Sequence, residues 1–309
     1  TASASAAAAA VLNLSADISA GANGILVGSV TNIGNITGTG IITTTGGKDL
    51  RNGSIEAGIT LAGNGAILKQ TTGTLVFAGE RAAASTGATG VREGDLILDY
   101  TTNNNSKIGG VLSLGLAGIL TDATLTLNGN AAAATTQSVT STTVLPGNMN
   151  VALNHGAGQT LTLELGALTR AVPGGTVFFQ YSSADAQAAS TSPAGTLGWA
   201  TVKTGTGAER FAAIDGSGNI VQATFTTQNN PSLWTAGQDV IVDDATTGLA
   251  GDCTTISSLT FTSSVASTVT VTAGQRLAIT GGGILVGTGL GAVDMRILGG
   301  ELVGAVYGV

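Results

Sequence analysis

The stretch TTISSLTFTSSVASTVTVTAGQRLAITGGGILVGTG, from Thr254 to Gly289, decides the fold. Its aliphatic and aromatic side chains fall in short alternating runs, and this two-residue period is typical of half-buried strands. Thr and Val favour strands because branched side chains pack well on a pleated surface, whereas the interspersed glycines would weaken a helix. The stretch therefore predicts several short strands and no helix.

The rest of the chain repeats this pattern in looser form. Apolar runs such as Leu75–Phe77 and Leu96–Leu98 alternate with turn residues such as Asn64–Gly65 and Gly109–Gly110. Strands of about four to seven residues joined by short turns are the expected result. Three longer polar inserts, around residues 81–93, 103–107 and 184–194, interrupt this pattern and are predicted to be projecting loops.

The composition separates a repeat protein from a compact enzyme. Hydrophobic residues make up 43% of the 309 residues, but only 4% are aromatic and 9% are charged, against about 25% charged in typical globular proteins. Sandwiches and barrels also contain many short strands, but they need larger core side chains than this chain supplies over most of its length. Small residues suit a parallel solenoid instead, in which each coil of roughly 20 to 25 residues stacks on the previous one.

We therefore expect an all-β solenoid with projecting loops. Residues 1–23 are predicted to be a small-residue segment that serves as a cap or an assembly arm, and residues 24–309 are predicted to form the solenoid. An aromatic-richer section at about 175–235 is expected to be a thicker part of the same body, because Phe178, Phe179, Tyr181 and Phe211 are concentrated there.

Five segments carry a resemblance to a known family. TTGTLVFAGERAAASTGATGVREGDLILDY at 71–100 resembles the autotransporter-associated β-strand repeat, in which a GTLVL-type strand and a Thr/Gly-rich loop precede a return strand. Further segments similar to proteins that carry this repeat lie at 109–130, 159–170, 195–224 and 254–262. The resemblance implies a right-handed parallel β-helix in a passenger-type secreted bacterial protein at the cell surface.

Charge and hydropathy limit the classes of partner and the cellular location that are expected. The 11 Lys and Arg residues are scattered singly in a chain of net charge −7, so nucleic acid is not an expected partner, because binding to phosphates needs clustered cations. No run of 18 apolar residues is present, so no membrane-spanning segment is expected. The segment TASASAAAAAVLNLSA fits the mature end left by signal-peptide cleavage, which predicts an extracellular or cell-surface location.

The sequence contains little that could perform catalysis. His155 is the only histidine, and it is expected to be a turn residue between strands because no Ser or Thr stands out as its partner. Cys253 is the only cysteine, so it has no intramolecular disulfide partner and is expected to be a small buried side chain. His155 and Cys253 show no metal-ligand spacing. We therefore expect no enzyme activity, no cofactor and no metal.

Four residues are candidates for glycan or ion binding. Asp239 and Asp243 belong to the densest group of carboxylates, and on a strand they would share one face. Parallel β-helix enzymes that handle acidic polysaccharides use carboxylates on one strand face. Trp199 and Trp234 could stack on sugars if they are exposed. Each residue also has a structural interpretation, as a strand end or as part of the core.

The leading hypothesis is a non-catalytic structural or adhesive protein that assembles into a fibre or layer. A solenoid leaves strand edges open at both ends, and open edges pair with other chains unless charges, proline or a cap prevent it. The predicted partners are therefore further copies of the chain in a homo-oligomer or polymer, with surface glycans as a second class. The alternatives are a carbohydrate-binding or carbohydrate-active β-helix module, and a viral or phage fibre protein.

Overall fold

The computed structural model describes residues 10–171, 174–244, 246–249, 253–262, 264–287 and 293–304. Within these ranges the chain is nearly all β, and its one helical element is a short 3-10 helix, η1 (Pro231–Leu233). The chain divides into two compact units, residues 1–192 and residues 193–309. The structure confirms the predicted all-β solenoid, because almost all neighbouring strands run parallel and successive coils pair with each other.

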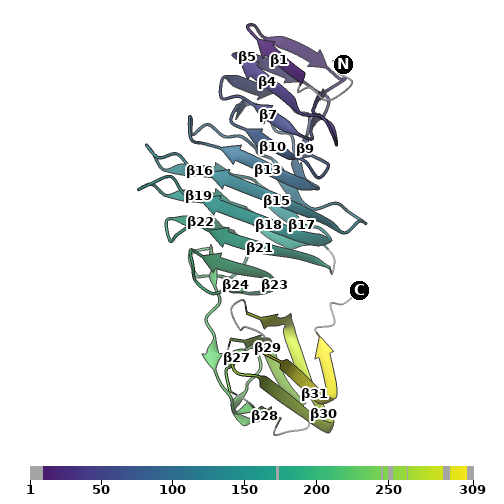
Figure 1. Cartoon of the computed structure of the whole chain (residues 1–309), viewed down its shortest axis with the longest axis vertical. Coiled ribbons are helices and arrows are strands. Elements are labelled where there is room, and N and C mark those ends of the chain that lie inside the picture. Colours follow the sequence, from purple (N-terminus) through teal and green to yellow (C-terminus); the bar gives the residue numbers. More distant parts are fainter. Residues whose placement is uncertain are drawn as a thin grey trace. The chain divides into compact units, whose positions relative to one another are not determined.

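Unit 1 is a stack of parallel coils whose strands form long ladders (Figure 1). The first ladder contains β1 (Ala10–Leu14), β4 (Gly34–Gly38), β7 (Gly53–Ile55), β10 (Thr74–Phe77), β13 (Gly94–Asp99), β15 (Thr121–Asn128), β18 (Gly147–Asn154) and β21 (Gly175–Tyr181). The second contains β2 (Ile18–Gly21), β5 (Gly40–Thr44), β8 (Ile59–Ala62) and β11 (Glu80–Arg81).

Two further ladders complete the coils of unit 1. The third contains β3 (Ile25–Val27), β6 (Lys48–Leu50), β9 (Ile67–Lys69), β12 (Thr89–Val91), β14 (Val111–Leu114), β17 (Ser141–Val144) and β20 (Ala167–Arg170). The fourth contains β16 (Thr135–Ser138), β19 (Leu161–Glu164) and β22 (Ala186–Ala189). Each strand covers one side of its coil, and the chain turns at the corners between ladders.

The core of unit 1 consists of columns of aligned apolar side chains. In the first ladder Phe77 pairs with Leu98, Leu98 with Leu127, and Leu127 with Leu153, and all four are 0% exposed. The residues between them on each strand face outward, as the two-residue period requires. Like side chains thus stack on like, which explains why short aliphatic runs suffice to build the core.

The coils vary in length. Ile36 pairs with Ile55, an offset of 19 residues, whereas Leu98 pairs with Leu127, an offset of 29 residues. The extra residues of the longer coils lie in the corners and loops, because the paired strand registers themselves stay continuous. The expected range of 20 to 25 residues per coil was therefore too narrow.

Glycines allow the coils to stack closely at one corner. A Cβ added to Gly65 would stand 1.7 Å from the carbonyl oxygen of Gly46 on the preceding coil. A Cβ on Gly87 would stand 2.5 Å from the carbonyl oxygen of Gly65, so the same close approach recurs one coil later. Only glycine fits at such a contact, because real Cβ atoms do not approach backbone oxygens this closely.

Unit 2 combines an antiparallel sheet with a second parallel stack. β23 (Gly195–Thr204), β24 (Arg210–Ile214) and β25 (Asn219–Gln222) run antiparallel. Asp215 closes the β24–β25 turn, since its side chain accepts hydrogen bonds from the backbone N–H groups of Ser217 and Asn219. The parallel stack contains β26 (Thr226–Thr227), β27 (Asp239–Val242), β28 (Thr246–Gly248), β29 (Cys253–Phe261), β30 (Ser267–Val286) and β31 (Met295–Gly304).

The stretch that decides the fold becomes β29 and β30. Ile256, Leu259, Val269 and Leu277 point into the core of unit 2 and are 0% exposed. Val265, by contrast, lies outside the strands and is 52% exposed. The alternating pattern thus identified most of the inward side chains of this stack.

The segment 1–23, predicted to be a cap or an assembly arm, contains two described strands, and its role stays a prediction. β1 and β2 lie within the segment 1–23 and pair in parallel with β4 and β5, so the solenoid already includes residues 10–21, while residues 1–9 lie outside the described ranges. The aromatic-richer section at 175–235 includes residues of both units, which divide after residue 192. β1 contains the aliphatic residues typical of a strand, but the run of alanines before it makes its start difficult to recognise in the sequence.

The predicted projecting loops are largely part of the coils. The insert at 81–93 contains β12, and the insert at 184–194 contains β22. The insert at 103–107 ends in Lys107, which is 0% exposed. Lys107 is polar in the sequence but buried in the structure, because its ammonium group donates to the carbonyl oxygens of Ala78 and Gly79 on an earlier coil.

Candidate functional site

Asp239 and Asp243 form hydrogen bonds with different partners, and their role in glycan or ion binding stays a prediction. The Asp239 carboxylate accepts a hydrogen bond from the Thr196 hydroxyl and another from the Ser258 hydroxyl, each at 2.6 Å. Asp243 exchanges hydrogen bonds with Asn229, whose side-chain nitrogen donates to Asp243 Oδ1 at 2.8 Å. Asp239 thus connects β27 to β23 and β29, and Asp243 connects the end of β27 to the loop before η1.

The two tryptophans differ in exposure. Trp234 is 7% exposed, belongs to the core of unit 2, and donates its indole N–H to the backbone oxygen of Gln228 at 2.8 Å. Trp199 lies on β23 and is half-buried. Trp199 therefore offers more surface to a sugar ring than Trp234 does, and the glycan role of both residues stays a prediction.

His155 connects two consecutive coils of unit 1. Its Nδ1 lies 2.7 Å from the Ser182 hydroxyl and 3.3 Å from the Ser183 hydroxyl, and its Nε2 lies 3.9 Å from an Asp185 carboxylate oxygen. The Nε2 to carboxylate distance exceeds a hydrogen bond, and Ser182 Oγ also accepts the backbone N–H of His155. This arrangement ties the turn after β18 to the turn after β21.

Sequence reasoning missed the most unusual residues of unit 1, which are three interior lysines. Lys48, Lys69 and Lys107 are 1%, 0% and 0% exposed. Lys48 Nζ donates to the carbonyl oxygens of Gly63 and Gly65, at 3.1 and 3.0 Å. Each ammonium group thus reaches corner carbonyls, which the paired strands leave without partners.

The other two lysines bind corners in the same manner. Lys69 Nζ donates to the carbonyl oxygen of Thr71 at 2.6 Å and to that of Glu93 at 2.9 Å. Lys107 Nζ donates to the carbonyl oxygens of Ala78 and Gly79, at 2.9 and 2.8 Å, and lies 4.7 Å from the centre of the Tyr100 ring. The ring face and the carbonyls together stabilise this buried charge.

Burial changes the proton affinity of these groups. Desolvation lowers the pKa of Lys69 and that of Lys107 to about 8, and nearby carboxylates offset part of this effect. Burial also lowers the pKa of Lys48, and the charge of Arg81 lowers it further. These directions follow from removing a cation from water.

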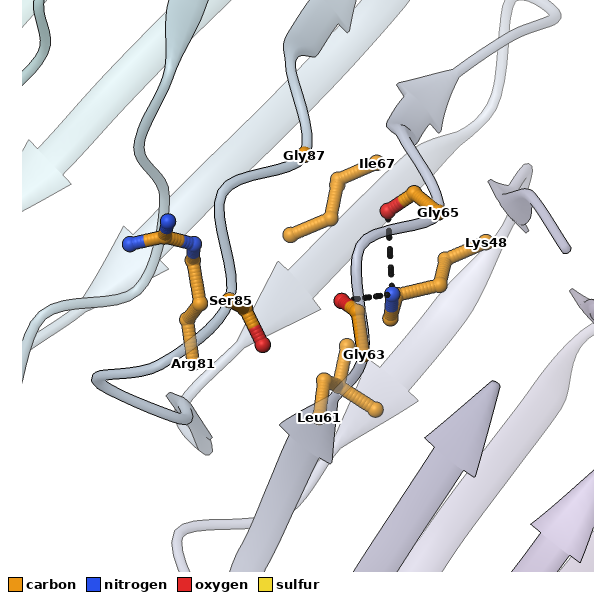
Figure 2. Close-up of a pocket in the computed structure, with 8 residues that line it drawn as sticks. All are labelled: Lys48, Leu61, Gly63, Gly65, Ile67, Arg81, Ser85 and Gly87. Atoms are coloured by element: carbon orange, nitrogen blue, oxygen red, sulfur yellow. Dashed lines mark hydrogen bonds between the residues drawn. The ribbon is translucent and has the colours of Figure 1, made fainter. Parts of the chain in front are cut away.

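A small hollow opens beside Lys48, where the corners of two coils meet (Figure 2). Figure 2 shows Lys48 bound to Gly63 and Gly65, with Ser85 lying between the Arg81 side chain and the Gly63 carbonyl. Leu61, Ile67 and Gly87 complete the lining. The hollow combines two cations, a hydroxyl and backbone groups, and no acidic side chain is among its lining residues.

The described part of the chain shows neither a metal cluster nor a spanning helix. No group of three or more His, Cys, Asp or Glu side chains in it is placed to hold a metal ion. None of its helices is long and apolar enough to cross a membrane. The side chain of Cys253 lies outside the described structure, so its role stays a prediction.

Comparison with known proteins gives one informative relative. No family model and no solved structure matches the chain. The chain is 31% identical over 232 residues to the adhesin BmaC autotransporter of Brucella suis biovar 1 (strain 1330). The match covers 72% of this chain and 6% of that protein. The chain is thus homologous to a short segment of an autotransporter adhesin, and its β-solenoid is the architecture consistent with an autotransporter passenger domain.

Proposed function

We propose that the chain is a non-catalytic adhesive segment of a bacterial cell-surface or extracellular protein. The observation that carries the proposal is the match of 232 residues to an adhesin, found in a chain that folds into stacked parallel coils. A solenoid of this type presents long continuous outer faces, which suit attachment to extended surfaces. The side chain of His155 connects two coils, and that of Asp239 connects neighbouring strands.

Adhesion is tested by displaying the purified chain on fluorescent beads. Beads that carry the chain should remain on cultured cells or on matrix-coated glass under flow, and beads that carry an unrelated β-protein should be washed away. Soluble chain added in excess should release the bound beads. Equal retention of the two kinds of bead would remove the support for an adhesive role.

We also propose that copies of the chain associate with each other, and the exposed first coil of unit 1 supports this. Leu12 occupies the same inward column as Ile36, yet Leu12 is 45% exposed whereas Ile36 is 5% exposed. Ile18 and Ile42 differ in the same way, at 38% and 0%. In the described residues β1 has a strand partner on one side alone, so both its edge and the core beneath it are open.

The last described coil of unit 2 is open as well. β31 pairs with β30 along one edge, and Leu302 is 50% exposed although its partner Leu277 is 0% exposed. Stacking β31 of one copy on β1 of the next would cover both exposed columns. Such a contact joins two different surfaces, so repeated addition of copies would produce a fibre or a closed ring.

Sedimentation velocity across a range of concentrations tests self-association. The chain should form larger species as its concentration rises, and Leu12→Lys should reduce them because it places a charge over the open column. Val11→Lys is the matched control, because Val11 pairs with Asn35 on the outer face. A chain that stays monomeric throughout, or equal effects of the two variants, would contradict assembly through this end.

Glycan binding is the second candidate function, and the half-buried Trp199 on β23 favours it. An exposed part of an indole ring can stack on a sugar face. A glycan array with the intact chain tests this, and Trp199→Ala should abolish any signal while the Trp234 fluorescence is retained. Binding that survives Trp199→Ala would assign the sugar to another surface.

A further inference from the structure

Two cations meet at the hollow without an acidic partner. Arg81 forms no ion pair in the part of the chain that the structure describes. Lys48 uses two of its three N–H groups on the carbonyls of Gly63 and Gly65, which leaves one N–H for another acceptor. Both cations line the hollow and repel each other, and this repulsion adds to burial in lowering the pKa of Lys48. An anion placed between them would relieve this repulsion.

Ser85 adds a hydroxyl that lacks a partner. It is 4% exposed, it lines the hollow, and its Oγ has no hydrogen-bond partner in the structure. A buried hydroxyl without a partner costs free energy, so the site is incomplete as it stands. Ser85, Lys48 and Arg81 all have N–H or O–H groups to donate, which is the donor set that an oxyanion requires.

We propose that this hollow binds one small tetrahedral oxyanion, a sulfate or phosphate group, either as a free ion or as a substituent of a glycan. The net charge of −7 disfavours an extended polyanion, since the rest of the surface would repel it. A single anionic group contacts the local cations alone and escapes most of that repulsion through salt screening.

The anion binds at the mouth of the hollow. Its interior has no room for a water-sized molecule in the present arrangement. Arg81 is the adjustable part, because its long side chain can rotate over Ser85 while the backbone around it is fixed by strand pairing. The Arg81 guanidinium now rests on Gly109, where an added Cβ would stand 2.3 Å from Nη1.

Titration of the intact chain with inorganic sulfate, followed by calorimetry at low ionic strength, tests the proposal. We expect saturable binding at one site and at least about a tenfold weaker affinity in Arg81→Ala, since a charge-assisted pair is lost. Gly109→Ala should strengthen binding, because its Cβ crowds the resting position of the Arg81 guanidinium and favours the rotation over Ser85 without changing any charge. Ser85→Ala should weaken it several-fold.

Arg92→Ala is the matched control, because Arg92 lies in the same unit and contacts Gln70 outside the hollow. Its affinity for sulfate should equal that of the parent chain. Absence of saturable binding, or an equal loss in Arg92→Ala, would overturn the proposal, and circular dichroism excludes unfolding as the cause. A sulfated disaccharide and its unsulfated form, titrated in parallel, distinguish a glycan substituent from a free ion. The outcome of these titrations is independent of the bead-adhesion and sedimentation experiments, so the anion site can be refuted without refuting the adhesive function.

Discussion

The two units stack parallel strands in the same way but fill their interiors differently. Unit 1 places Lys48, Lys69 and Lys107 inside its coils, and each ammonium group binds corner carbonyls. The core cluster of unit 2 is apolar, and its members are Trp234, Val240, Val242, Leu249, Ile256, Leu259, Phe261, Val269, Val271, Leu277 and Ile279. Tight glycine corners leave carbonyl groups that point inward, and a long cationic side chain satisfies several of them at once.

This difference can be measured because each unit has its own signal. The chain contains two tryptophans, Trp199 and Trp234, and both belong to unit 2. Tryptophan fluorescence therefore follows the unfolding of unit 2, whereas far-ultraviolet circular dichroism follows the strands of both units. A destabilising substitution in unit 1 should therefore lower the urea concentration at which the circular dichroism changes and leave the tryptophan transition unchanged.

The largest expected effect comes from filling a glycine corner. Gly65→Ala would place a Cβ 1.7 Å from the carbonyl oxygen of Gly46, and backbone has no rotamer with which to move away. The two coils must separate, so the free energy of unfolding of unit 1 should fall by about 3 kcal/mol or more. Urea titration followed by circular dichroism measures this loss.

Gly47→Ala is the control for that substitution. A Cβ at Gly47 meets its nearest atom, the carbonyl oxygen of Ala66, at 4.0 Å, and its backbone is not in the left-handed region. The variant should unfold at the same urea concentration as the parent chain or slightly above it. A Gly65→Ala variant as stable as Gly47→Ala would show that the corners do not pack this closely.

The next largest effect comes from removing one interior charge. Lys107→Met keeps the apolar stem but leaves the carbonyls of Ala78 and Gly79 without their cation. The free-energy cost of the lost hydrogen bonds to these carbonyls exceeds the gain from no longer burying a charge. The free energy of unfolding of unit 1 should therefore fall by about 1 to 2 kcal/mol. The same substitution at Lys203, on β23 of unit 2, should change stability by less than about 0.5 kcal/mol. Equal losses of stability in the two variants would contradict the conclusion that unit 1 alone depends on interior lysines.

The sequence predicts the strands and their inward faces well, but not the corners. Alternation identifies residues such as Leu125 and Leu127 because every inward column needs apolar side chains. The offset between paired strands of unit 1 varies from 19 to 30 residues, so the stacking partner of a strand cannot be derived from a fixed period. Lys107 follows a run of asparagines that is typical of a loop, and its burial depends on carbonyls 28 and 29 residues earlier.

The candidate site was less predictable for the same reason. His155 meets Ser182 across an offset of 27 residues, and Ser85 lines the same hollow as Lys48 although it belongs to a later coil. Neither pairing leaves a local motif in the sequence. Unit 2 adds an antiparallel sheet, for which the Asp215–Gly216 turn was the available signal.

The pH dependence of stability provides a second test of the interior cations. The pKa of Lys69 and that of Lys107 are about 8 in the folded chain, against 10.5 in the unfolded chain. Between these values the unfolded state binds more protons, so the free energy of unfolding of unit 1 should rise from pH 8 to pH 10. Below pH 8 both states are charged, and this contribution is constant.

Urea titrations at pH 7, 8, 9 and 10 measure this rise. Tyr100 limits the window, because burial raises its pKa and the unfolded tyrosine loses its proton above about pH 10. The double variant Lys69→Met, Lys107→Met should flatten the rise, and the tryptophan signal of unit 2 should not show it. A slope that persists in the double variant would assign the effect to other groups.

The smallest expected effect concerns the corner that Lys69 binds. Thr71 has a φ of 75°, in the left-handed region that disfavours branched side chains, and its carbonyl accepts the Lys69 ammonium at 2.6 Å. Thr71→Gly removes a steric penalty of about 1 to 2 kcal/mol and adds about 0.5 to 1 kcal/mol of chain entropy to the unfolded state. The variant should therefore be more stable by about 0.5 kcal/mol. The gain should be larger when Lys69 is replaced by Met, because the Thr71 carbonyl then loses the hydrogen bond that holds this corner in its strained conformation. A loss of stability with and without the Lys69→Met substitution would show that the Thr71 side chain stabilises the corner.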